Sequence, residues 1–406
     1  MSGIYIHIPF CKQACHYCDF HFSTSLKKRD EMVKALAKEI ELRKTEFKTE
    51  TVETIYFGGG TPSLLTIDEL RFLIETIYKN YKVSNNPEIT LEANPDDLVI
   101  ASKLTANVTL RADIIDNKML SPRAQSRDFM DRIFYDYKSI GINRLSIGIQ
   151  SFFEDDLKLM NRAHNAAEAK ACLAEATRHF DNISVDLIYG IQNSTKEKWL
   201  QNIETALSFG IPHISSYALT VEPKTALASF IAKGIIEDVD DELAHEQFNL
   251  LKNKLETEGF VHYELSNFGK EGFFSKNNTA YWQGKSYIGI GPSAHSFNGK
   301  ERGWNLRNNS KYIQSIEDGI LPIEIEELTK VDHYNEYIMT GLRTMFGVSL
   351  SKVELEFGKN YKDYLLKHAE IFIQQQLLYI ENNHLKTTQK GMFLSDGISS
   401  ELFKLN

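Results

Sequence analysis

The sequence lacks any apolar stretch of 18 residues, the length that a membrane-spanning helix needs. It also lacks a charged segment followed by an apolar targeting core, because Met1, Ser2 and Gly3 lead directly into a strand-like run. These two absences argue against a membrane-spanning chain and against a secretory signal. We therefore expect a soluble protein of the cytoplasm.

An excess of positive charge is also missing, since 46 Lys and Arg residues face 55 Asp and Glu residues, for a formal net charge of -9. Broad affinity for nucleic acid needs clustered cations that neutralise phosphates, so we expect no nucleic-acid partner. Cysteine is scarce, with four residues in 406, which suits a reducing compartment better than a disulfide-stabilised secreted domain. The length allows about two domains and a substantial core.

Three of the four cysteines, Cys11, Cys15 and Cys18, fall within eight residues, directly after the apolar run 4–10. Cys172 lies far away in an Ala-rich helical pattern, where a small apolar side chain predicts a core position. A local triplet of thiolates favours a 4Fe-4S cluster with one iron open to a small ligand. A zinc site is the alternative, with His16 or His21 as a fourth ligand. A disulfide would leave one thiol of the triplet unpaired.

Apolar runs of strand length alternate with amphipathic helical stretches, which is typical of β/α units on a parallel sheet. The runs cover residues 4–8, 52–57, 88–92, 144–149, 183–189 and 214–219. Two of the helices between them have capping-box starts, at Thr66 with Glu69 and at Ser194 with Glu197. Six such units predict a partial barrel.

Polar, turn-forming motifs follow these strands, at 58–62 (Gly-Gly-Gly-Thr-Pro), 92–97 (Glu-Ala-Asn-Pro-Asp-Asp), 148–152, 161–164 and 186–190. In α/β barrels the loops beyond the carboxyl ends of the strands carry the active site. A glycine run on its own could be a tight turn into a helix. These motifs follow the second to the fifth strands one after another, with 161–164 coming after 148–152, and together they instead predict one site.

The spacing of the three cysteines, with Tyr17 just before the third, resembles the radical S-adenosylmethionine (SAM) signature. Its flanks, Tyr-Ile-His-Ile-Pro-Phe at 5–10 and Cys-Asp-Phe at 18–20, resemble the heme chaperone family HemW, which is kin to the oxygen-independent coproporphyrinogen III oxidases. The resemblance covers nearly the whole chain. It implies an α/β fold, a partial (β/α)6 TIM-like barrel of the radical SAM type followed by a C-terminal α+β domain that resembles a winged helix.

By this resemblance Cys11, Cys15 and Cys18 hold a 4Fe-4S cluster whose open iron binds SAM. The same resemblance implies nine residues that contact SAM: Tyr5, Tyr17, Gly59, Gly60, Thr61, Glu92, Gln150, Arg162 and Asp186. Carboxylates suit the ammonium and sulfonium groups of SAM, and an arginine suits its carboxylate.

The resemblance also implies a heme site at the family pattern His-Asn-x-x-Tyr-Trp. Asn278, Tyr281 and Trp282 match this pattern, but Asn277 stands where the family has histidine and cannot ligate iron. A heme ligand would then come from His295, His262 or Tyr281. Aromatic faces in this region suit a porphyrin, and they suit domain packing equally well.

The expected domains are a radical SAM core at 1–232 with the cluster and SAM sites, a barrel extension at 233–320 with the heme motif variant, and a C-terminal HemN-like domain at 321–406. Residues 99–128 are an insertion that we interpret as a surface excursion. In the last domain we expect helices at 332–345 and 390–403, and two strands within 377–388 around Asn382 and Asn383. The net negative charge of the chain favours a docking or lid role for this domain over DNA binding.

Three classes of function stay open. The first is a heme chaperone that binds heme, a 4Fe-4S cluster and SAM and delivers heme to acceptor proteins such as respiratory components. Any association of such a chaperone with a membrane would be peripheral and would occur through the acceptor protein. The second is a coproporphyrinogen III oxidase, but the resemblance disfavours it because those enzymes carry a further cysteine where this chain has Phe20, and a longer segment before the cluster. The third, a zinc-binding structural protein, leaves the strand-end motifs unexplained.

Overall fold

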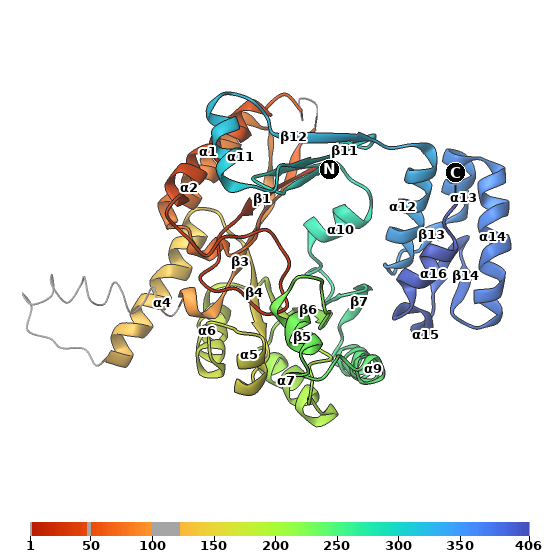
Figure 1. Ribbon diagram of the computed structural model, residues 1–406, viewed down its shortest axis with the longest axis horizontal. Coiled ribbons are helices and arrows are strands. Elements are labelled where there is room, and N and C mark those ends of the chain that lie inside the picture. The colour runs from red at the N-terminus through yellow and green to blue at the C-terminus, as the bar shows by residue number, and fades with distance from the viewer. Residues whose placement is uncertain (1, 47–49, 99–121, 406) are drawn as a thin grey trace, which may run out of the picture.

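The computed structural model describes residues 2–46, 50–98 and 122–405, and its main feature is a twelve-stranded sheet (Figure 1). Six strands, each parallel to the next, form its centre. They are β1 Ser2–Ile8, β2 Val52–Gly59, β3 Val83–Ala93, β4 Arg144–Gln150, β5 Ile183–Tyr189 and β6 His213–Ala218. All six predicted strands are confirmed. The strand order runs from β12 at one edge to β7 at the other, so the sheet does not close into a complete barrel.

Helices cover the outer face of this sheet (Figure 1). They are α1 Arg29–Leu42, the short turn η1 Pro62–Leu64, α2 Ile67–Asn80, α4 Pro122–Ser139, α6 Ala166–His179, α7 Lys196–Ser208 and α9 Asp241–Thr257. Two short helices, α5 Glu154–Leu159 and α8 Ala226–Ala232, form a separate small cluster with Tyr17. In α2 the buried residues Leu70, Leu73 and Ile77 recur at helical spacing. Complete burial of each such side chain stabilises the fold by about 1.5 to 3 kcal/mol.

One of the two predicted capping boxes is confirmed. Thr66 accepts from the backbone N–H of Glu69, whose carboxylate accepts from the N–H of Thr66. The prediction at Ser194 is wrong by one residue, because Thr195 caps α7 by accepting from the N–H of Lys198. The hydroxyl of Ser194 instead accepts a side-chain amide hydrogen bond from α9.

Strands that the sequence analysis did not predict extend the sheet on both sides. Next to β1 lie β9 Tyr287–Ile290, which pairs parallel, and then the antiparallel strands β10 His295–Phe297, β11 Glu301–Asn305 and β12 Ile323–Glu327. Beyond β6 lie β8 Asn267–Gly269 and β7 Val261–Glu264. The short helix α10 Lys276–Trp282 lies between β8 and β9 in the chain and contacts β1 and β2, and α11 Asn309–Glu317 packs on α1.

The C-terminal domain has its own core, which includes Tyr334, Ile338 and Val353. Its elements are α12 Lys330–Leu342, β13 Val348–Ser349, α13 Leu350–Phe357, α14 Lys359–Gln374, β14 Leu378–Glu381, β15 His384–Thr387, α15 Gln389–Met392 and α16 Ser395–Glu401. The predicted hairpin is confirmed, with Asn382 and Asn383 at φ 47° and 62° in its tight turn. The helix predicted at 390–403 is two short helices, α15 and α16. Helices α13 and α14 were not predicted.

Two backbone hydrogen bonds join this domain to the edge of the barrel, from Leu265 N–H to Arg343 O (2.8 Å) and from Met345 N–H to Tyr263 O (3.0 Å). An ion pair of 2.7 Å joins Arg302 on β11 to Glu336 on α12. Of the predicted insertion at 99–128, residues 99–121 lie outside the described part of the chain, and α4 begins at Pro122. No helix in the described ranges is long and apolar enough to cross a membrane.

Candidate functional site

The three clustered cysteines lie in the loop that connects β1 to α1, and other loops hold this segment in place. The Gln13 side-chain amide donates to Asn161 Oδ1 (2.6 Å), and the Asn161 side-chain amide donates back to Ala14 O (2.7 Å). Nδ1 of His16 donates to Leu159 O (2.8 Å). The cysteine loop is thus fastened to the segment that follows β4.

The three thiols are free and face a cavity of about 170 Å³, here called the small cavity. Its other walls come from the carboxyl ends of β2, β3, β4 and β5 and from Arg162. All the residues predicted to contact SAM, except Tyr5, line it: Tyr17, Gly59, Gly60, Thr61, Glu92, Gln150, Arg162 and Asp186. Cys172 is completely buried on α6, so the predicted separation of this cysteine from the triplet is confirmed.

Neither imidazole proposed for a zinc site joins the three thiols. His16 is turned towards Leu159 O and meets the ring of Phe230 edge-on at 5.0 Å. His21 shares a 2.7 Å hydrogen bond with Asn309 Oδ1. Neither lines the small cavity. The three sulfurs therefore face this cavity without either candidate imidazole as a fourth ligand, which fits a cluster with one open iron better than the zinc site considered from the sequence.

Arg162 connects the cysteine loop with the strand ends. Its guanidinium lies 3.4 Å from Sγ of Cys15 and donates to Asn94 Oδ1 (2.5 Å) and to Gly148 O (3.0 Å). Its buried Nε has no hydrogen-bond partner among the described residues. Arg162 thus has an unsatisfied N–H donor beside the small cavity, and an anionic ligand there would accept its hydrogen bond. Asn94 belongs to the 92–97 motif, but its part in holding Arg162 was not predicted.

Two carboxylates, Glu92 on β3 and Asp186 on β5, line the small cavity from the sheet. Glu92 accepts from the hydroxyl of Tyr56 (2.8 Å), and Asp186 accepts from the hydroxyl of Ser146 (3.2 Å). Desolvation raises the pKa of Glu92 to about 7, helped by the charge of Asp186, and desolvation raises the pKa of Asp186 to about 6. Neighbouring carboxylates in a desolvated site favour a cationic ligand, whose charge would stabilise both ionised forms.

The glycine motif after β2 lets the chain pass close to the cysteine loop. A Cβ at Gly60 would lie 2.5 Å from Phe10 O, and Gly59 has φ 108°. At the end of β4, Gln150 has φ 65°, which is uncommon for a residue other than glycine. Its backbone conformation coincides with a shift of register between β4 and β5. The walls of the small cavity therefore contain two locally unusual backbone positions.

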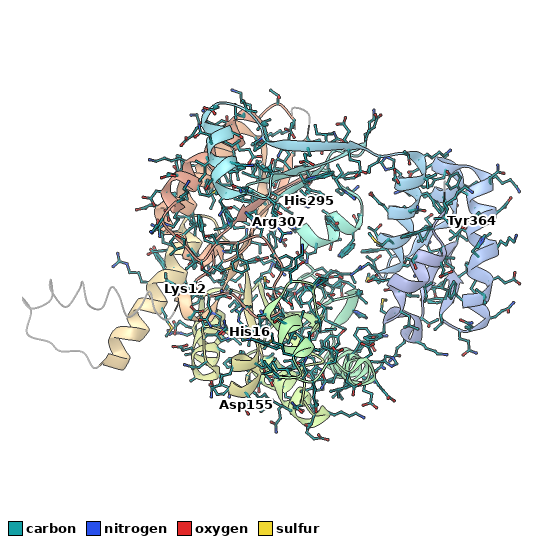
Figure 2. All side chains as sticks on the ribbon, in the orientation of Figure 1. Lys12, His16, Asp155, His295, Arg307 and Tyr364 are labelled. Atoms are coloured by element: carbon teal, nitrogen blue, oxygen red, sulfur yellow. The ribbon has the colours of Figure 1, made fainter. Side chains whose placement is uncertain are left out.

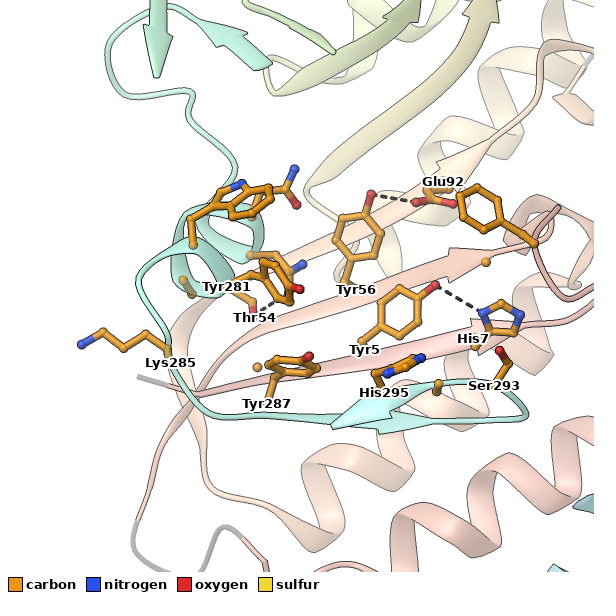
Figure 3. A pocket seen from close by; sticks show the side chains of 18 of the residues that line it. Tyr5, His7, Thr54, Tyr56, Glu92, Tyr281, Lys285, Tyr287, Ser293 and His295 are labelled. Atoms are coloured by element: carbon orange, nitrogen blue, oxygen red, sulfur yellow. Dashed lines mark hydrogen bonds between the residues drawn. The ribbon is translucent and has the colours of Figure 1, made fainter. Parts of the chain in front are cut away.

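A second cavity of about 910 Å³, here called the large cavity, adjoins the small cavity. Phe20, Gly59 and Glu92 line both. Tyr5 lies in the large cavity, where its ring stacks on Tyr56 at 5.9 Å. Figure 3 shows Tyr5, Tyr56 and Tyr287 projecting from neighbouring strands into this space. The strand order β9-β1-β2 accounts for this row of aromatic side chains.

Helix α10 forms one wall of the large cavity and carries all the residues of the predicted heme motif. Asn278, Tyr281 and Trp282 line the cavity, and so does Asn277. Tyr281 is 44% exposed and meets Trp282 edge-on at 5.1 Å. Oδ1 of Asn277 accepts from the hydroxyl of Thr54 (3.2 Å). The residues that the resemblance assigns to the heme motif therefore lie together on one wall of the large cavity.

The three heme-ligand candidates have different positions. His295 and Tyr281 line the large cavity (Figure 3), and His295 is also labelled in the view of the whole molecule (Figure 2). The ring of His295 has no hydrogen bond to any described residue. His262 is buried elsewhere, stacked on Phe268 at 4.2 Å, and burial lowers its pKa to about 4. The suggestion that His262 could ligate heme here is therefore wrong, because its ring belongs to the core between β7 and β8.

Two imidazoles of the large cavity were not predicted. His7 is 6% exposed, and its Nε2 shares a 2.9 Å hydrogen bond with His21 O. His21 lines the cavity as well. The alternation along β1 could have revealed His7, because Ile4, Ile6 and Ile8 are all buried in the core and the intervening residues must face the opposite side.

Comparisons with known proteins agree with this geometry. A family model of the radical SAM superfamily matches residues 5–206, and a model of the HemN C-terminal domain matches residues 328–394. Coproporphyrinogen III oxidase (HemN) from Escherichia coli has the same fold, with a TM-score of 0.79 at 21% identity over 99% of this chain and 90% of that chain. The fold and the cysteine-lined cavity define a radical SAM protein.

Curated relatives narrow the class further. Heme chaperone HemW of Bacillus subtilis (strain 168) is 31% identical over 402 residues, which cover 98% of this chain and 98% of that protein. Heme chaperone HemW of Mycobacterium tuberculosis (strain ATCC 25618 / H37Rv) is 28% identical over 402 residues, which cover 98% and 93% of the two chains. The chain belongs to the HemW family.

Proposed function

We propose that this protein is a heme chaperone that carries a 4Fe-4S cluster and SAM in the small cavity and binds heme in the large cavity for delivery to acceptor proteins. The observation that carries the proposal is the direct contact between the two cavities, which share Phe20, Gly59 and Glu92 as walls. A ligand in the large cavity would lie next to a ligand in the small one.

The donor groups of the small cavity fit the cluster and SAM. Cys11, Cys15 and Cys18 would hold the cluster, which supplies an electron to bound SAM in this superfamily. Arg162 would bind the carboxylate of SAM with its unsatisfied Nε–H. Glu92 and Asp186 would bind the cationic groups, and Gly60 lets the backbone approach the ligand.

The large cavity suits heme by size and by chemistry. Its volume of about 910 Å³ lies within the usual range for ligand sites, roughly 300 to 1,000 Å³. Aromatic side chains offer flat faces, and three arginines line the cavity: Arg302, Arg307 and Arg343. Arg302 and Arg343 are already paired with Glu336 and Asp396, so Arg307, which has no ion pair to a described residue, would bind a carboxylate of heme. His295 would ligate the iron, because its ring is free of hydrogen bonds to the described residues.

Conversion of coproporphyrinogen III is the alternative function, supported by the fold that this chain shares with HemN. Against it stands Phe20, which is 68% exposed on the wall between the two cavities. The oxidases resembled by this chain carry a cysteine at that position. An aromatic face in its place offers a stacking surface for a bound macrocycle and no thiol.

Anaerobic reconstitution of the cluster, followed by parallel assays, tests the proposal. We expect uptake of heme at micromolar concentration, visible as a Soret band, and no decarboxylation of coproporphyrinogen III in the presence of SAM and a reductant. Decarboxylation without heme uptake would replace the chaperone proposal with the oxidase. Transfer of heme from the loaded protein to an apo-protein of the respiratory chain would test delivery.

A further inference from the structure

A third cavity, of about 530 Å³, lies between the barrel and the C-terminal domain, and we call it the interdomain cavity. Tyr281, Trp282, Tyr287 and Arg302 line both this cavity and the large cavity. The large and interdomain cavities are therefore separated by a single layer of side chains, here called the aromatic wall (Tyr281, Trp282 and Tyr287). Tyr281 and Tyr287 are labelled in Figure 3, which shows the wall from the large cavity.

Contacts between the domains hold the C-terminal domain against the aromatic wall. The Arg343 guanidinium lies 5.2 Å from the centre of the Trp282 ring, and the ion pair between Arg302 and Glu336 measures 2.7 Å. Within the wall, the ring of Tyr281 lies 5.1 Å from that of Trp282 and 5.6 Å from that of Tyr287. On its barrel side the interdomain cavity is thus bounded by aromatic rings in mutual contact and by the ion-paired Arg302.

The opposite side of the interdomain cavity comes from α12 and α13. Lys330, His333 and Tyr337 line it at positions i, i+3 and i+7 of α12, so they share one face of that helix. Lys352 of α13 lies 4.3 Å from the centre of the Tyr337 ring. This surface combines an aromatic face with cationic groups, and Glu336, the acidic residue on the same helix face, is already paired with Arg302.

Two further side chains of this surface are ligands that heme iron accepts. His333 is partly exposed, and its imidazole has no hydrogen bond to any described residue. Met339 also lines the cavity and offers a thioether sulfur. Histidine and methionine are the axial ligands of many heme proteins. The interdomain cavity therefore combines an aromatic wall, cationic side chains and an imidazole without a hydrogen bond to a described residue, as the large cavity does.

We propose that the interdomain cavity is a second binding site for an iron tetrapyrrole with carboxylate side chains, so that this protein holds such a ligand on either side of the aromatic wall. The inference rests on the proposed function, because it assumes that the large cavity takes the same class of ligand. In the second site His333 or Met339 ligates the iron, Lys330 and Lys352 pair with the carboxylates, and the aromatic wall packs on the ring.

The volume and the charges support this choice of ligand. A cavity of about 530 Å³ is large enough for a drug-sized ligand, which typical sites of roughly 300 to 1,000 Å³ enclose. The facing acidic groups are compensated, since Glu336 is paired with Arg302 and Glu356 lies 4.0 Å from Lys352. An anionic ligand therefore meets a surface on which Lys330 has no ion pair to any described residue, so its ammonium group is available to a carboxylate.

Titration of the full-length protein with hemin tests the second site by stoichiometry. We expect two equivalents with distinct absorption spectra. The double variant His333→Ala with Lys352→Glu should weaken one of them at least tenfold and leave the affinity of the other within about twofold. His295→Ala in the large cavity should weaken the other equivalent at least tenfold and leave the affinity of the interdomain cavity within about twofold. Lys367→Glu, the same charge reversal on an exposed residue of α14, is the matched control and should change neither.

The outcomes separate this inference from the proposed function. One equivalent of hemin that is insensitive to the double variant overturns the second site and leaves the chaperone proposal intact. One equivalent that responds only to the double variant overturns the placement of heme in the large cavity as well as the two-site inference. No binding of hemin at all overturns the proposed function itself. Equal thermal unfolding midpoints for the variants and the wild type would show that the losses do not come from misfolding.

Discussion

The hydroxyl of Tyr56 donates a hydrogen bond of 2.8 Å to Oε1 of Glu92 at the wall that the small and large cavities share. This bond favours the ionised carboxylate, whereas desolvation and the charge of Asp186 oppose it and raise the pKa of Glu92 to about 7. The two cavities therefore meet at a carboxylate whose charge changes near neutral pH. A cation bound in the small cavity would stabilise its ionised form.

Replacement of Glu92 by Gln should weaken the binding of SAM by about 1.5 to 3 kcal/mol, the usual contribution of a hydrogen bond to a charged group. The variant keeps the shape of the side chain but removes the charge that faces the cationic groups of SAM. Isothermal titration calorimetry on the reconstituted protein measures the change. Glu75→Gln, on the exposed face of α2, is the control. Equal affinities for both variants and the wild type would place Glu92 outside the SAM site.

The affinity for SAM should also rise with pH between about 5.5 and 8, because Glu92 and Asp186 attract cations only when ionised and their pKa values are about 7 and 6. In Glu92→Gln the rise should be smaller and should end at lower pH. A profile that is flat in the wild type would show that neither carboxylate contributes its charge to binding.

The same raised pKa values predict how the stability of the ligand-free protein depends on pH. A carboxyl whose pKa is higher in the folded state than in the unfolded state, where it is about 4.3 for Glu, stabilises the fold fully below that lower value. This contribution is lost as pH rises through the folded value of about 7. The free energy of unfolding in urea should therefore fall from pH 5 to pH 7.5, and Glu92→Gln should reduce this fall.

Cys172→Ala should leave the iron content unchanged, because Cys172 is completely buried on α6, away from the small cavity. The loss of the sulfur from a packed core should lower the free energy of unfolding by about 1 kcal/mol. Cys15→Ala should lose the cluster, since Cys15 lines the small cavity. Iron and sulfide analysis with the visible spectrum distinguishes the two variants. A Cys172→Ala protein without iron would overturn the assignment of the cluster.

Asn277→His should tighten the binding of heme or shift its Soret band. Oδ1 of Asn277 accepts from the hydroxyl of Thr54 on the wall of the large cavity. In the variant that hydroxyl can accept from Nδ1–H of the introduced imidazole, which leaves Nε2 available to iron. Asn80→His, at the end of α2, is the control for an added surface imidazole. Identical spectra and affinities for all three proteins would argue that heme does not reach α10.

Gly60→Ala should destabilise the protein and lower its cluster content, because the new Cβ would lie 2.5 Å from Phe10 O and 2.8 Å from Ile8 O. Both contacts are with backbone atoms, so the segment before Cys11 must move. Gly397→Ala on α16 is the control, since no atom lies within 4 Å of its added Cβ and alanine favours a helix. Thermal unfolding and iron analysis of the two variants test this difference.

The sequence by itself determined the cysteine triplet, the six parallel strands and the residues at their carboxyl ends. These features follow from short-range properties of the chain. Metal ligands three or four residues apart can meet in one loop, and a buried parallel strand appears as a continuous apolar run. Once the strands were known, the geometry of a parallel sheet placed Gly60, Glu92 and Asp186 at one edge, and the small cavity lies there.

The tertiary structure alone decided which of the candidate heme ligands face the large cavity. His262 and His295 are equivalent as histidines in the sequence, but the first is stacked in the core on Phe268 and the second faces the large cavity. Likewise, Tyr5 lies in the large cavity because β9 and β2 flank β1 and align their aromatic side chains. These positions depend on which strands pair and which side chains pack together, and the strands on either side of Tyr5 come from segments far apart in the sequence.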